Sequence, residues 1–126
     1  MRAIDTNVLV RLITRDDSRQ TAKAESFIAA GAWVSTIVLA ETIWVLGAVF
    51  DLDSLSQATA IEMLLNHRQL VLDERETVAA ALALFRAKPT LGFADCLILE
   101  TARKAGHMPL GTFDRNLAKV AGTQKL

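Results

Sequence analysis

The sequence predicts an α/β domain with a mostly parallel sheet. Short apolar runs that fit buried strands alternate with longer segments in which apolar residues recur at helical spacing. This alternation is typical of parallel sheets whose strands are connected by helices. The chain has 126 residues, of which 52% are hydrophobic, and no stretch rich in Pro, Gly or Ser divides it. We therefore expect residues 1–126 to form a single domain with a hydrophobic core.

The elements of the first half follow from apolar spacing, caps and glycines. Asp17 and Ser18 are suited to cap a helix that ends at Gly31. Ser54 and Gln57 have the spacing of a capping box at the start of another helix. In order, we expect a strand at 2–4, a helix through 8–13, a helix from 17 or 18 that buries Phe27 and Ile28, a strand at 32–34, a helix within VSTIVLAETIWVLGAVF at 34–50, and a helix from 54 through 65.

The second half continues the same pattern. Asp73 with Glu76 is suited to cap an alanine-rich helix, which Pro89 ends. A further helix over 93–105 carries Arg103 and Lys104 in its last turn, where they complement the helix dipole. In order, we expect a strand at 70–72, a helix up to 88, the helix at 93–105 ending at Gly106, a strand at 110–113 and a short helix from Asp114.

Charge and composition narrow the possible partners and compartments. Fourteen basic and fourteen acidic residues give a net charge of zero, so an anionic partner must be held locally. The single cysteine, Cys96, excludes an intramolecular disulfide, and we expect a buried, inert thiol. No signal peptide is visible, and the longest apolar run contains Glu41 and is too short to span a membrane.

Glu41 is the carboxylate that local structure explains least. It lies in the middle of the apolar segment 34–50, where no capping role is open to it. In a helix its nearest neighbours are four apolar side chains, Ile37, Val38, Trp44 and Val45. A charge on such a face needs a cation, a donor or water. Glu41 either faces solvent on a polar strip beside Thr42 or projects into a shared acidic site.

Three aspartates lie near predicted strand ends or helix starts. Asp5 and Asp114 stand where a strand gives way to a helix, and Asp95 lies in the first turn of its helix. Taken singly, each fits an ordinary N-cap. Ligands of parallel sheets bind outside the carboxyl ends of the strands, so Asp5 and Asp114 are also expected to share one edge. Converging carboxylates repel unless a cation binds, and oxygen ligands favour Mg²⁺ or Mn²⁺, which suit phosphodiester hydrolysis.

Four short motifs resemble those of the PIN-domain nucleases. AIDTN, AETIWVL, FADCLIL and GTFD follow one another in the order and approximate spacing of that family, and the resemblance covers nearly the whole chain. It is strongest to the VapC-type toxins of bacterial and archaeal type II toxin–antitoxin systems. It implies a PIN-like three-layer fold, with a central, mostly parallel sheet of four to five short strands flanked by helices. The family's last strand would fall at 122–126.

The resemblance also implies an activity and its residues. Asp5, Glu41, Asp95 and Asp114 become an acidic quartet that binds Mg²⁺ or Mn²⁺ and supports endonucleolytic cleavage of RNA. Two polar residues in the same motifs, Asn7 and Thr112, match supporting positions. The implied partners are an RNA substrate, a cognate antitoxin and a second copy of the chain in a homodimer, with no membrane. The implied compartment is the cytoplasm of a bacterium or archaeon.

Other interpretations remain open at this point. Arg11, Arg15, Arg19 and Lys23 recur every fourth residue and either form a solvated surface or line one side of the pocket, with Arg11 and Arg15 touching the RNA backbone. A catalytically silent PIN-fold module that binds RNA or protein is one alternative function, although all four acids are present. An aspartyl phosphotransfer domain with Asp5 as nucleophile is another, but Asp5 stands in a DTN element and is not followed by a second aspartate two residues later.

Overall fold

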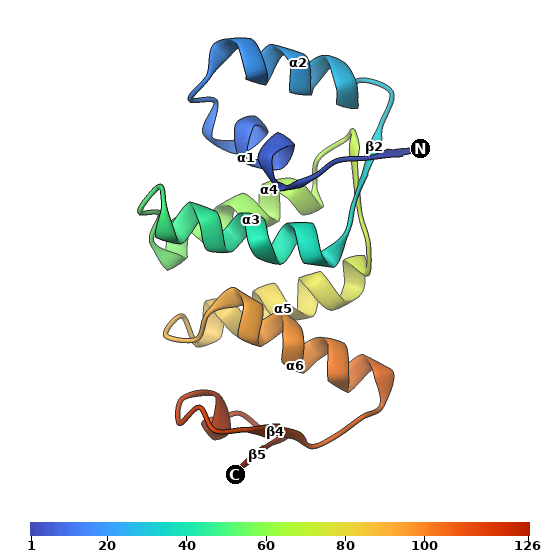
Figure 1. Ribbon diagram of the computed structural model, residues 1–126. Helices are drawn as coiled ribbons and strands as arrows, with labels where there is room; N and C mark the ends of the chain where they lie inside the picture. Colours follow the sequence, from blue (N-terminus) through green and yellow to red (C-terminus); the bar gives the residue numbers. More distant parts are fainter. The chain divides into compact units, whose positions relative to one another are not determined.

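The computed structural model describes residues 1–126 and confirms the α/β class. Five short strands alternate with six α-helices and one 3₁₀-helix (Figure 1). The chain divides into two compact units, a first unit at Met1–Arg75 and a second unit at Glu76–Leu126. No helix combines the length and the apolar content that crossing a membrane requires.

The first unit contains a three-stranded parallel sheet and four helices. Its elements are β1 (Arg2–Ala3), α1 (Thr6–Thr14), α2 (Ser18–Ile28), β2 (Ala32–Val34), α3 (Thr36–Ala48), α4 (Ser54–Leu65) and β3 (Leu70–Leu72). The strands are bonded in the order β1–β2–β3, with Arg2 opposite Ala32 and Trp33 opposite Val71. Helix α1 packs against both α2 and α3 and lies between them (Figure 1).

One face of this sheet forms the centre of the first unit. In β2, Ala32 and Val34 are buried while Trp33 between them is exposed, and β3 repeats the pattern around the exposed Val71. The alternation fits four helices on a single face, as right-handed crossovers in the order β1–β2–β3 produce. The core side chains on that side are fully buried and include Leu9, Leu39, Leu46 and Ile61.

Side-chain caps start the four helices of the first unit. Asp17 accepts a hydrogen bond from the Gln20 N–H at 3.0 Å, which confirms the predicted start of α2. The predicted capping box on α4 is wrong, because Asp53 and not Ser54 is the cap. Gln57 instead donates to the Leu52 carbonyl at 2.9 Å. An aspartate one residue upstream accepts from the helix N–H groups better than a serine already inside the first turn.

The second unit contains two helices packed through aromatic residues and a small parallel sheet. Its elements are α5 (Arg75–Ala87), which begins at the boundary, α6 (Phe93–Ala105), β4 (Leu110–Thr112), the 3₁₀-helix η1 (Leu117–Lys119) and β5 (Thr123–Lys125). Phe85 of α5 and Phe93 of α6 meet edge to face, with ring centroids 5.9 Å apart. Strand β4 pairs only with β5, placing Leu110 opposite Thr123.

Strand pairing is parallel within each unit, as predicted. The strands pair in the order β1–β2–β3 in the first unit and as β4–β5 in the second, and the final strand lies within 122–126 as expected. The last two strands bond to each other: the Leu110 N–H donates to Gly122 O, and the Leu126 N–H donates to Thr112 O, both at 2.9 Å. The helix expected to open at Asp114 is the single 3₁₀ turn η1.

Candidate functional site

Asp5 lies at the carboxyl edge of the sheet in the first unit. It follows β1 directly and caps α1, its Oδ1 accepting a hydrogen bond from the Val8 N–H at 3.2 Å. The capping interpretation of Asp5 is therefore confirmed. The bond uses one carboxylate oxygen, and Oδ2 makes no hydrogen bond or ion pair. Because the side chain is exposed, that second oxygen remains available to a ligand.

Glu41 lies on α3, the helix that begins after the neighbouring strand β2. The carboxylate is exposed, and so are Ile37 and Trp44 beside it. Thr42 is buried and donates to the Val38 carbonyl at 2.7 Å, so the predicted polar strip beside Glu41 does not exist. The carboxylate is open to solvent, where water solvates its charge, and its part in a shared acidic site stays a prediction.

The sheet topology of the first unit places Asp5 and Glu41 on two helices that pack together. Strands β1 and β2 are parallel neighbours, so α1 and α3 start from the same edge of the sheet and pack together. Asp5 stands at the start of the first helix, and Glu41 lies six residues beyond the Ser35 cap of the second. The sheet thus brings the two helices that carry these acids together.

Asp95 and Asp114 form a like-charged pair in the second unit. Asp95 is half-buried in the first turn of α6, whose N-cap is Gly92, so Asp95 itself is not the cap. Burial raises the pKa of Asp95 above its usual value, and the nearby Asp114 carboxylate raises it further. A cation near both groups would relieve that repulsion.

Asp114 is held by local hydrogen bonds after β4. Its Oδ1 accepts from the Asn116 N–H at 2.8 Å and the Leu117 N–H at 2.9 Å, and its own N–H donates to Thr112 Oγ1 at 3.0 Å. The predicted supporting residue Thr112 thus fixes the backbone of an acid. Asn7, the other predicted supporting residue, is exposed beside Asp5 at the start of α1.

A pocket of about 400 Å³ opens beside Asp5 between α1 and α2. Its lining residues are Asp5, Asn7, Val8, Arg11, Gln20, Lys23, Ala24 and Phe27. Arg11 lines this pocket, which is one of the two alternatives that the sequence left open for it. No expectation from the sequence placed Gln20 or Phe27 there. Their spacing with Lys23 marks one face of α2, but only the packing of α2 on α1 brings that face next to Asp5.

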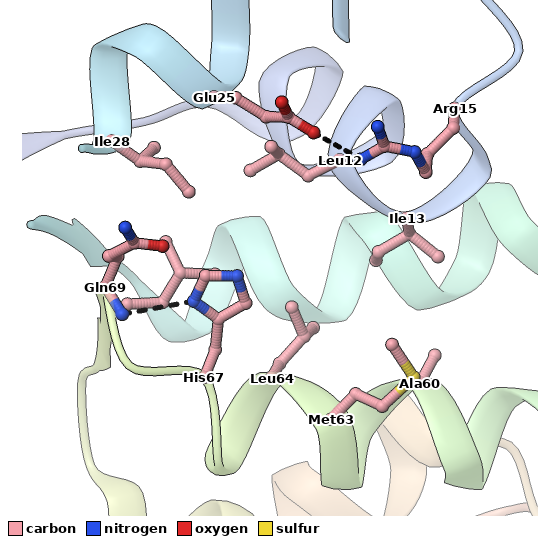
Figure 2. Close-up of a pocket in the computed structure, with 11 residues that line it drawn as sticks. Leu12, Ile13, Arg15, Glu25, Ile28, Ala60, Met63, Leu64, His67 and Gln69 are labelled. Carbon is pink, nitrogen blue, oxygen red and sulfur yellow. Dashed lines mark hydrogen bonds and ion pairs between the residues drawn. The ribbon is translucent and has the colours of Figure 1, made fainter. Parts of the chain in front are cut away.

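Arg15 lies at a different cavity of the first unit (Figure 2). This cavity, of about 280 Å³, is mainly apolar and shares no lining residue with the pocket beside Asp5. The Arg15 guanidinium forms an ion pair with Glu25, drawn as a dashed line in Figure 2. Nearby, His67 Nδ1 accepts a hydrogen bond from the Gln69 N–H at 3.1 Å. The charge of Arg15 therefore has a partner that Lys23 lacks.

The carboxylates of each unit have the chemistry that a hard divalent cation requires. The structure contains no group of three or more His, Cys, Asp or Glu side chains that could hold a metal ion. Asp5 in the first unit and Asp114 in the second each keep one oxygen out of their caps. An oxygen-only donor set suits Mg²⁺ or Mn²⁺. Cys96 is buried with its pKa raised to about 11, chiefly by burial, so it is no thiolate ligand or nucleophile at neutral pH.

Comparison with known proteins identifies the family. The family model described as PIN domain matches residues 3–123, a span that includes all four acids and reaches into both units. No match to the chain is found among curated proteins.

Proposed function

The chain belongs to the PIN domain family, and on that premise we propose that it is a Mg²⁺- or Mn²⁺-dependent endoribonuclease and the toxin of a type II toxin–antitoxin pair. The family has a nuclease-type fold, and its nucleases act on nucleic acids, typically with divalent metals. The observation that carries the proposal is the match over 3–123, which contains Asp5, Glu41, Asp95 and Asp114 within the motifs AIDTN, AETIWVL, FADCLIL and GTFD.

In this proposal the four acids bind the cation. When bound, such an ion activates water and stabilises the charge that develops on the phosphate. The chain's own task is to hold the oxygens in place: the Val8 N–H fixes one oxygen of Asp5, and the N–H groups of Asn116 and Leu117 fix one of Asp114. Thr112 positions Asp114 through its backbone, and Asn7 lies where it would bind phosphate or water.

A cleavage assay tests the enzyme. Purified chain, free of antitoxin, is incubated with structured RNAs and with DNA of the same sequences, in Mg²⁺, Mn²⁺ or EDTA. We expect RNA cleavage that needs the ion and is lost in Asp5→Asn and Glu41→Gln. Asp17→Asn is the matched control, because Asp17 caps α2 as Asp5 caps α1 but lines neither pocket.

Three results would contradict the nuclease proposal in different ways. Cleavage that persists in EDTA, or in both acid variants, would exclude the metal site. RNA binding without cleavage by the intact chain would indicate a silent binding module. Phosphorylation of Asp5 by a small phosphodonor would indicate phosphotransfer instead.

The toxin role needs a test in cells. We expect expression of the chain to stop bacterial growth and the Asp5→Asn variant to be harmless at the same protein level. A cognate antitoxin would restore growth by binding the chain in the cytoplasm. If the purified chain cuts RNA while expression leaves growth unchanged, the nuclease stands and the toxin role fails.

The proposed homodimer is supported by an apolar surface on α3. Ile37 and Trp44, seven residues apart and so on one side of α3, are 76% and 67% exposed, and Val49, the C-cap residue after the helix, is 64% exposed. Sedimentation velocity should show a dimer, and Trp44→Glu should yield monomers. An identical sedimentation coefficient for the two proteins would remove this surface from the dimer.

A further inference from the structure

The pocket beside Asp5 is built by two facing helix surfaces. Asn7, Val8 and Arg11 of α1 face it from one side. Four residues of α2 spaced three, four and seven apart face it from the other: Gln20, Lys23, Ala24 and Phe27. Its volume of about 400 Å³ falls within the range of about 300–1,000 Å³ that small-molecule sites occupy.

Lys23 is the uncommitted cation of this pocket. Arg11 also lines it, but its Nε donates to Gln20 Oε1 at 2.6 Å and its Nη1 pairs with Asp16 Oδ1 at 3.1 Å. No hydrogen bond or ion pair engages the Lys23 ammonium, and the residue is exposed. A flexible ammonium with three free donors suits the phosphate of a nucleic acid.

Phe27 supplies an aromatic wall. Its ring is half-buried, and the Arg2 guanidinium lies 3.8 Å from the ring centroid while donating to the Phe27 carbonyl at 3.0 Å. Arg2 does not line the pocket, so it steadies the ring without filling the space. Aromatic side chains held in this way are the usual stacking partners of bases in single-stranded RNA.

We propose that this pocket holds one nucleotide of the RNA next to the bond that is cut, with Lys23 on a phosphate and Phe27 against the base. The inference rests on the proposed function, since it takes Asp5 as part of the cleavage site. It adds two specificity residues, Lys23 and Phe27, that the acidic motifs do not contain. A pocket that accepts a single base would also favour single-stranded segments over duplex RNA.

Binding measured without cleavage tests the two residues separately. A fluorescent single-stranded RNA of mixed sequence is titrated in EDTA over a series of salt concentrations. Lys23→Gln should lower the slope of log K against log [salt] by about 0.7, the value for one phosphate contact on a single strand. Phe27→Leu should weaken binding by about fivefold or more and leave the slope unchanged, and Phe27→Tyr should restore binding.

A matched control excludes a general charge effect. Arg68→Gln also removes one exposed positive charge, but Arg68 precedes β3 and so lies at the opposite edge of the parallel sheet from Asp5. It should leave both affinity and slope unchanged. Urea midpoints of all variants are measured in parallel, so that a folding defect is not read as lost binding. Equal slopes for Lys23→Gln and wild type, or equal losses in Lys23→Gln and Arg68→Gln, would overturn the phosphate contact.

Cleavage kinetics separate this inference from the nuclease proposal. In Mn²⁺, Lys23→Gln should raise KM and leave kcat near the wild-type value, because the contact is made equally in the ground state and transition state. If the chain binds RNA as described but never cuts it, the pocket stands and the nuclease proposal fails. If the chain cuts RNA and neither Lys23 nor Phe27 affects binding or KM, the pocket fails and the nuclease stands.

Discussion

Asp5 in the first unit and Asp95 in the second both stand in the first turn or cap of a helix, yet their surroundings differ. Asp5 is exposed and accepts the Val8 N–H of the helix it caps. Asp95 is half-buried in the first turn of α6, near Asp114, and both burial and that neighbour raise its pKa. Asp5 thus has a hydrogen-bond donor from its own helix, whereas burial and a like-charged neighbour oppose the ionised form of Asp95. Such an unfavourable charge is expected at functional sites more than in ordinary surface structure.

The sheets that precede Asp5 and Asp114 also differ, both in the number of paired strands and in burial. Asp5 follows a three-stranded sheet whose central strand has two buried side chains. Asp114 follows a two-stranded sheet in which no strand residue is fully buried. We therefore expect local changes to lower stability more in the second unit than in the first. Four predictions test this comparison.

The largest expected effect is a loss of kcat, and it should be equal for an acid of the first unit and an acid of the second. Asp5→Asn and Asp114→Asn should each lower kcat in Mn²⁺ by more than about 100-fold, the upper range for residues that only support metal ligands. The neutral amide removes a charge that the cation requires. Initial rates at saturating RNA measure this. A large loss from one unit only would show that one pair of acids suffices and that the quartet is wrong.

The difference between the two sheets predicts that alanine substitutions at two glycines lower the free energy of unfolding by unequal amounts. Gly122 has φ +92°, and a Cβ there would lie 2.6 Å from Met108 Cε and 3.1 Å from the Arg103 guanidinium. Gly122→Ala should lower the free energy of unfolding by about 2–3 kcal/mol. At Gly31, with φ +97°, an added Cβ would lie 3.2 Å from the end of Met1 and 3.9 Å from the Gln69 carbonyl oxygen, so Gly31→Ala should cost about 1 kcal/mol.

Urea unfolding in EDTA measures both glycine variants. Gly111→Ala is the control, because its added Cβ makes only ordinary contacts at 3.4 Å with Leu126, and it should change stability by less than about 0.5 kcal/mol. Similar urea midpoints for Gly122→Ala and Gly111→Ala would contradict the prediction that a side chain at Gly122 destabilises the second unit.

The next prediction separates the cap from the chemistry at Asp5. Asp5→Ala should cost about 1 kcal/mol of stability because it removes the acceptor for the Val8 N–H, and Asp17→Ala should cost about the same on α2. Asp5→Asn keeps an oxygen acceptor and should retain most of the stability while losing cleavage. If Asp5→Ala is as stable as wild type, the cap contributes nothing and the carboxylate serves the site alone.

The smallest effect concerns the charge of Asp95. Its folded pKa lies above the usual value of 3.8, so the folded state binds the proton more tightly than the unfolded chain. Stability without metal should therefore fall as pH rises from 3.8 through the folded pKa, and the loss is complete above it. Asp95→Asn should remove that loss and raise the urea midpoint at pH 7 in EDTA.

Glu41→Gln is the matched change in the first unit. Because Glu41 is exposed, its replacement by glutamine should alter the free energy of unfolding at pH 7 by less than about 0.5 kcal/mol. Equal responses of Asp95→Asn and Glu41→Gln would show that the two units hold their charges alike, against the comparison drawn from the structure.

Several elements could be predicted closely from the sequence. The helix over Phe93–Ala105, the strands at 32–34 and 70–72 and the Asp17 cap all match the structure. These features depend on apolar spacing and on hydrogen bonds within four residues. The four acids of the proposed site were identified through their motifs, and their roles in binding a metal ion and in RNA cleavage stay predictions.

Other features depend on distant parts of the chain or on a choice between neighbours. Two alternatives were open for Glu41, and packing exposes it together with its apolar neighbours Ile37 and Trp44, which no pattern within one helix could reveal. The cap on α4 was missed for a local reason, since two plausible caps, Asp53 and Ser54, stand side by side.

The sequence by itself determined the α/β class, the order of strands and helices, and the family, because local periodicity, caps and short motifs are properties of neighbouring residues. Only the tertiary structure decided the strand order and register within each unit, and that Lys23 and Phe27 line a pocket with Asp5 while Arg15 pairs with Glu25 elsewhere. The physical reason is that strand pairing and helix packing join residues far apart in the chain, whose partners are selected by the total area buried and not by any local signal.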